Sequence, residues 1–150
     1  MAKKSLTTLA GRFYEDERPI GTVIELSTVI NQAVNAARAY AAYGAIESKL
    51  PVDALLGTDH TDPLFPVLNA LPVPATDWVD ALTDVTQQEW GVIKPLFILY
   101  VERENAIHLE ASRQLGVDVY GRQSSEISQE ITQMEEAIPR LAFYQPVISV

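Results

Sequence analysis

The sequence predicts an all-α fold: a small helical bundle with one long kinked helix, a proline-rich excursion and an extended C-terminal arm. Three stretches repeat apolar residues at three- and four-residue steps, the spacing of helices with one buried face. Six prolines and glycines interrupt residues 48–76, so no long helix fits there. The last twelve residues are mostly apolar, aromatic and β-branched, which favours an extended strand.

The first long helix is predicted from Thr22 to about Ile46, after an N-terminal arm at residues 1–21. Thr22 and Glu25 have the spacing of a capping box. The helix is rich in alanine, so it can pack closely on more than one neighbour. It is either the central helix of the chain's own core or a helix shared with an adjacent subunit. In the second case the candidate interface residues are Ala33, Ala37, Tyr40, Ala41 and Gly44.

The segment from Ser48 to Thr76 is too apolar for a free linker, and it is predicted to be a structured excursion that packs on the helices. Long irregular segments of this kind are often functional. A short helix is predicted over residues 77–83.

The longest helix is predicted to begin at a capping box formed by Thr86 and Glu89 and to end near Leu115, with Gly116 as the residue that stops it. Pro95 lies beyond the first turn, so a kink is expected there. The expected apolar side consists of Trp90, Ile93, Phe97, Tyr100, Ile107 and Ala111.

The third helix is predicted from Ser124 to Ile138, ending before Pro139. Its apolar stripe consists of Ile127, Ile131, Met134 and Ile138, and its glutamates lie elsewhere around the helix. The domain that these helices form is predicted to cover residues 22–138, with an extended arm at residues 139–150.

Composition excludes several classes of protein. A chain of 150 residues with 47% hydrophobic residues is long enough for one domain with a real core. The absence of cysteine excludes disulfides and thiolate chemistry. No signal peptide and no membrane span are expected, because no apolar run is long enough. The net charge of −9 argues against binding nucleic acid through its phosphates.

The negative charge is unevenly distributed. Between residues 51 and 86 the charged side chains are all aspartates: Asp53, Asp59, Asp62, Asp77, Asp80 and Asp84. They form either a solvated acidic surface or a surface that repels a polyanion.

Catalytic and metal-binding motifs are not found. His60 and His108 are far apart in sequence, and Glu104 with His108 forms a single i,i+4 pair on a helix. A di-iron bundle needs several such carboxylate and histidine ligands. Capping a helix explains Ser124 without a nucleophilic role. The sequence therefore predicts no enzyme activity, no cofactor and no metal.

The stretch from Thr86 to Val150 resembles a known family. It carries Glu89-Trp-Gly-Val-Ile-Lys-Pro-Leu-Phe-Ile-Leu-Tyr-Val-Glu-Arg-Glu-Asn105, then Leu109-Glu-Ala-Ser-Arg113, Val119-Tyr-Gly-Arg122 and the tail with Ala142-Phe143. These residues resemble the small head-to-tail connector, or adaptor, proteins of tailed bacteriophages, particularly contractile-tailed ones. The resemblance covers roughly the C-terminal half. The proline-rich excursion has no place in the family's usual four-helix plan.

The resemblance implies a virion protein, made in the host cytoplasm, that assembles as a homo-oligomeric ring, commonly twelve-fold. Its partners would be the portal protein, a tail or collar protein and the passing genomic DNA, with no membrane. In that family a C-terminal extension reaches into the portal. The candidate docking residues here are Leu141, Phe143, Tyr144, Val147, Ile148 and Val150. The six aspartates would line the channel and let DNA slide without sticking.

Two rival interpretations remain open. In the first, the chain is a small helical regulator or assembly chaperone whose C-terminal strand packs on its own core. In the second, it is an enzyme that uses Glu104 and His108.

Overall fold

The structure is a computed structural model that describes residues 2–49, 79–113, 116 and 121–143. The described elements follow one another along the chain as β1 (Lys4–Ser5), α1 (Leu6–Arg12), the π-helical turn η1 (Phe13–Glu17), α2 (Leu26–Ala41), the 3-10 turn η2 (Glu47–Lys49), β2 (Asp84–Val85), α5 (Gln87–Arg113) and α6 (Ser124–Phe143). Sheet structure in these residues is limited to a two-stranded antiparallel ribbon in which Lys4 lies opposite Val85. The predicted all-α class is confirmed.

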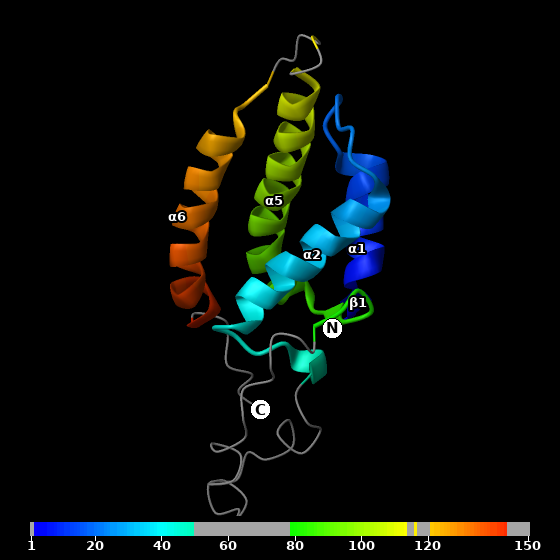
Figure 1. Ribbon diagram of the computed structural model, residues 1–150. Helices are drawn as coiled ribbons and strands as arrows, with labels where there is room; N and C mark the ends of the chain where they lie inside the picture. Colours follow the sequence, from blue (N-terminus) through cyan, green and yellow to red (C-terminus); the bar gives the residue numbers. More distant parts are fainter. Residues whose placement is uncertain (1, 50–78, 114–115, 117–120, 144–150) are drawn as a thin grey trace, which may run out of the picture.

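The long helix α5 forms the middle of the bundle (Figure 1). It packs on α2 and α6, and α2 packs on α1 and α6 as well. Small side chains allow α2 this number of neighbours, because Ala33, Ala36 and Ala37 are completely buried. The helix is therefore central to the chain's own core.

The predicted N-terminal arm is wrong, because most of residues 1–21 form packed helix. The Ser5 hydroxyl caps α1 by accepting a hydrogen bond of 3.3 Å from the Thr8 N–H. Leu6 and Ala10 are completely buried, and the ring of Phe13 meets Phe97 edge-on at 5.0 Å. The positions of Leu6, Ala10 and Phe13 follow helical spacing, so the sequence carried a signal for this helix.

One of the two predicted capping boxes is absent. Helix α2 begins at Leu26 rather than at Thr22, and its N-cap residue Glu25 makes no side-chain cap. The Thr22 hydroxyl instead donates to the Pro19 carbonyl oxygen at 2.8 Å. Because the Thr22 hydroxyl makes this bond, it does not cap α2. At its other end, α2 stops at Ala41, earlier than the predicted Ile46.

Helix α5 continues through Pro95, as predicted, but part of its apolar side was assigned wrongly. Ile107 is 45% exposed and Ala111 is also exposed, whereas Leu96, Val101 and Ala106 are buried. Both α2 and α6 pack on α5, so its buried surface is broader than one stripe. Gly116 has a φ of +88°, the left-handed conformation expected of a residue that stops a helix.

Helix α6 buries the predicted stripe but does not end before Pro139. It includes Pro139 and continues to Phe143. A proline inside a helix loses one backbone hydrogen bond. Burial of Ile138 and Ala142, which are 1% and 9% exposed, offsets that loss.

The predicted helix over residues 77–83 is also wrong where it can be judged. Residues 80–83 form a tight turn in which the Thr83 N–H donates to the Asp80 carbonyl oxygen at 3.1 Å. The predicted excursion from Ser48 to Thr76 lies mostly outside the described residues, apart from the end of η2.

Candidate functional site

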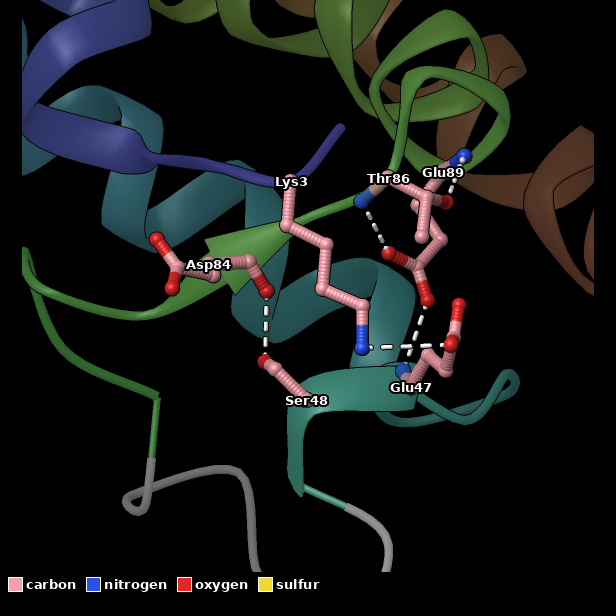
Figure 2. A network of polar contacts seen from close by, with 6 residues as sticks. All are labelled: Lys3, Glu47, Ser48, Asp84, Thr86 and Glu89. Atoms are coloured by element: carbon pink, nitrogen blue, oxygen red, sulfur yellow. Dashed lines mark hydrogen bonds and ion pairs between the residues drawn. The ribbon is translucent and has the colours of Figure 1, made fainter. Parts of the chain in front are cut away.

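The most elaborate polar site surrounds Glu89, at the start of α5 (Figure 2). This carboxylate is only 4% exposed. Its Oε2 accepts a hydrogen bond of 2.6 Å from the Thr86 N–H, and its Oε1 accepts one of 2.7 Å from the Glu47 N–H. The Glu89 N–H in turn donates a hydrogen bond of 3.3 Å to the Thr86 hydroxyl. The predicted capping box is therefore confirmed.

Two further contacts extend this network to β2 and to Lys3, the residue before β1 (Figure 2). Lys3 forms an ion pair of 3.1 Å with Glu47, and the Ser48 hydroxyl donates to the Asp84 carbonyl oxygen at 2.5 Å. The network therefore ties η2 to β2 and to the start of α5. Both oxygens of the buried Glu89 carboxylate accept from backbone N–H groups, so its role here is to hold the fold together.

The described acidic candidates, Asp80 and Asp84, are exposed. The Oδ1 atom of Asp80 accepts from the Leu82 N–H at 3.1 Å and from the Thr83 hydroxyl at 2.9 Å. The bond from Thr83 is the main cause that lowers the pKa of Asp80, so this carboxylate stays charged while it shapes the turn. Asp53, Asp59, Asp62 and Asp77 lie outside the described residues.

The structure places the predicted subunit-interface residues inside the chain's own core. Ala33 and Ala37 are completely buried, and Tyr40 and Ala41 are 2% and 5% exposed. Gly44 lies where a Cβ atom would be 2.9 Å from the Tyr40 ring and 3.1 Å from the Ala142 Cβ. Packing within one chain thus accounts for all five residues. This arrangement corresponds to the interpretation of the helix as the central helix of the chain's own core.

The predicted docking residues are described only at the end of α6. Leu141 is 37% exposed there, and Phe143 is the last residue of the helix. Tyr144, Val147, Ile148 and Val150 lie outside the described residues. Because Gly44 approaches Ala142, the ends of α2 and α6 meet, and the 62% exposed Tyr43 belongs to this end of the bundle.

The candidate catalytic pair provides no metal site in the described residues. Glu104 and His108 both belong to α5, and His108 is exposed. No group of three or more His, Asp or Glu side chains within the described ranges could hold a metal ion. His60 is outside those ranges. The described helices also include none that is long and apolar enough to span a membrane.

A groove of about 360 Å³ was not foreseen from the sequence. Its lining includes the apolar residues Leu9, Phe13 and Trp90 and the charged residues Lys4, Arg12, Glu17 and Lys94. These residues come from β1, α1, η1 and α5, which are far apart in sequence. Only their packing brings three of the chain's 11 basic residues to one groove.

A second groove of about 380 Å³ lies where the loop before α2 meets α5 and α6. Ile20, at its edge, has no cover from the described residues, with an exposed fraction of 107%. On the α6 side, Arg122 forms ion pairs with Glu102 and with Glu130.

Fold and sites together define a small all-α protein in which the hydrogen bonds of Glu89 and Asp80 link or shape neighbouring segments of the chain. The chain matches no protein-family model, no curated protein and no solved structure.

Proposed function

We propose that this protein is a structural subunit of the head-to-tail connector of a tailed bacteriophage. It acts by assembling into a ring between portal and tail, and genomic DNA passes through the ring. The observation that carries this proposal is the end of α6. The helix leads, past the exposed Leu141 and the terminal Phe143, into a sequence of seven uncharged and mostly apolar residues.

Such a sequence gains free energy when a partner removes it from water, at about 25 cal/mol per Å² of apolar surface, before ordering costs. An extended segment can also add a strand to a partner's sheet. Repetition around a ring then turns modest affinity per subunit into strong avidity. The segment 144–150 is therefore the proposed portal-docking arm.

The charge of the chain supports the same role. A ring of subunits that each carry a net charge of −9 repels the phosphates of passing DNA. Asp80 and Asp84, the described acidic candidates, are exposed. The proposal assigns the channel-lining role to the other four aspartates, Asp53, Asp59, Asp62 and Asp77.

Deletion of residues 144–150 tests the proposal. The shortened chain keeps all of α6 and every described core residue, so its circular dichroism and urea unfolding should match those of the full chain. It should lose binding to purified portal rings in co-sedimentation. Normal binding by the shortened chain would contradict the docking role.

The rival function, a helical regulator or assembly chaperone, is favoured by one observation: α2 is buried within a single chain. That function predicts a self-packed C-terminal strand. Deletion of residues 144–150 would then lower the stability of the subunit substantially, which distinguishes the two proposals.

A further inference from the structure

The turn between Asp80 and Asp84 presents an apolar side chain between two acidic ones. Leu82 is 77% exposed, and the aspartates at both ends of the turn are exposed. The Asp80 Oδ1 atom accepts hydrogen bonds from the Leu82 N–H and the Thr83 hydroxyl, and besides the Thr83 bond the nearby Lys49 also lowers the pKa of this carboxyl.

This turn is held firmly in place. The Thr7 hydroxyl and N–H both donate to the Ala81 carbonyl oxygen, at 2.7 and 3.0 Å. The Leu6 N–H donates to the Thr83 carbonyl oxygen at 3.0 Å. Because α1 and the turn are bonded in this way, Leu82 is displayed on a rigid support and little entropy remains to be lost on binding.

The groove between β1, α1 and α5 has the complementary character. Leu9 and Trp90 are apolar residues of its lining, and both are only partly buried. Of its basic residues, Lys94 is paired with Glu17 at 2.6 Å. Lys4 and Arg12 are exposed and form no ion pair with any described residue.

The charge of this groove is opposite to that of the chain. Three basic residues and one acidic residue give the groove a formal charge of +2, from three positive and one negative, in a protein of net charge −9. An exposed leucine flanked by two aspartates matches a groove whose lining combines apolar residues with two cations that form no ion pair with the described residues. Within one chain Leu82 does not line this groove and stays exposed.

We propose that the groove of one subunit binds the Asp80–Asp84 turn of a second copy. Leu82 would rest against Leu9 and Trp90, and the two aspartates would face Lys4 and Arg12. The inference rests on the proposed function and deepens it, since it names the contact between neighbouring subunits. A contact in which each subunit gives its turn to one neighbour and its groove to another is head-to-tail, the kind that generates rings.

A nucleic acid phosphate is the less suitable occupant. Glu17 lines the groove, and the apolar residues of the lining offer nothing to a phosphate. The net charge of the chain also repels a polyanion. A short acidic peptide also meets the charge of Glu17, but its apolar side chain fits the apolar residues of the groove, which a phosphate cannot use.

Sedimentation velocity across a concentration series tests the contact. The wild-type chain should form species larger than a dimer as concentration rises. Leu82→Ser and Arg12→Glu should each weaken association at least tenfold. Ile107→Ser is the matched control, because Ile107 is also an exposed apolar residue but lies in neither the turn nor the groove. It should associate as the wild type does.

Mixing the two variants makes the test specific. The Arg12→Glu chain keeps an intact turn and the Leu82→Ser chain keeps an intact groove, so the mixture should form one-to-one dimers while each variant alone stays monomeric. Wild-type protein that remains monomeric up to about 1 mM would overturn the proposal. So would association of Leu82→Ser at wild-type strength, or a wild-type assembly that stops at a dimer.

The outcomes separate this inference from the connector role. Assembly through Leu82 without binding to portal rings would leave the subunit contact standing and remove the connector. Portal binding together with unchanged ring formation by Leu82→Ser would leave the connector role standing and remove the proposed subunit contact. Loss of association on adding a DNA duplex, with the duplex bound, would show that the groove takes phosphates instead.

Discussion

The buried carboxylate of Glu89 should be among the most stabilising polar groups of the fold. It is 4% exposed and accepts two backbone hydrogen bonds, from Thr86 at 2.6 Å and from Glu47 at 2.7 Å. A hydrogen bond to a charged group contributes about 1.5–3 kcal/mol, and a buried donor left without a partner costs a similar amount. The free energy of unfolding of a native protein is only about 5–15 kcal/mol, so the contribution of Glu89 is a large part of it.

Two substitutions measure this contribution in steps. In Glu89→Gln one carbonyl oxygen remains, so one of the two N–H groups faces an amide NH₂ and the free energy of unfolding should fall by about 1.5–3 kcal/mol. In Glu89→Ala neither N–H group keeps its acceptor, and the loss should be about 3–5 kcal/mol. Glu136→Gln, on the exposed side of α6, should stay within about 0.5 kcal/mol of the wild type.

Urea unfolding followed by circular dichroism gives these differences, provided that the slope of free energy against urea is unchanged. A Glu89→Gln variant as stable as the Glu136→Gln control would refute the reasoning. It would mean that water or relaxation of the backbone replaces the carboxylate at no cost.

Three other predictions follow from packing, helix geometry and pH. Gly44→Ala should lower the free energy of unfolding by about 1–3 kcal/mol, because the new Cβ meets Tyr40. Gly91→Ala, where a Cβ meets nothing, should raise it by about 0.5–1 kcal/mol. Urea unfolding of both variants tests the two expectations. Pro139→Ala should raise the thermal midpoint by restoring a helix hydrogen bond, and an unchanged midpoint would contradict a continuous α6. Hydrogen bonds from Ser124 lower the pKa of Glu110, so they stabilise the fold fully above about pH 4.5, and this contribution is lost as the pH falls further. Glu110→Gln should therefore flatten the acid limb of a curve of stability against pH. An equally steep limb in the variant would exclude Glu110 as a cause.

Periodicity in the sequence predicted the helices that have one clear buried face. The stripe of α6 and the capping box of α5 were predicted because each depends on residues three or four positions apart. The ends of helices were less predictable. Pro139 was expected to end α6, but tertiary burial of Ile138 decides otherwise. The arm predicted at residues 1–21 was wrong because Phe13 gains its partner, Phe97, from a distant helix.

The candidate sites show the same limit. The alanines of α2 were compatible with either a core or an interface, and only the arrangement of α1, α5 and α6 around them decides where they are buried. The groove between β1, α1 and α5 combines side chains from separate parts of the chain. Long-range pairing of this kind leaves no local pattern, so Lys4, Arg12 and Lys94 did not stand out as a group.

The connector proposal is tested most directly by the mass of the complex formed with purified portal rings. The full chain and the chain lacking residues 144–150 are each mixed with the same rings, and mass photometry gives the number of bound subunits. The proposal predicts a full ring of subunits with the full chain and bare portal rings with the shortened, still folded chain. Equal occupancy by both chains, or none by the full chain, would contradict it.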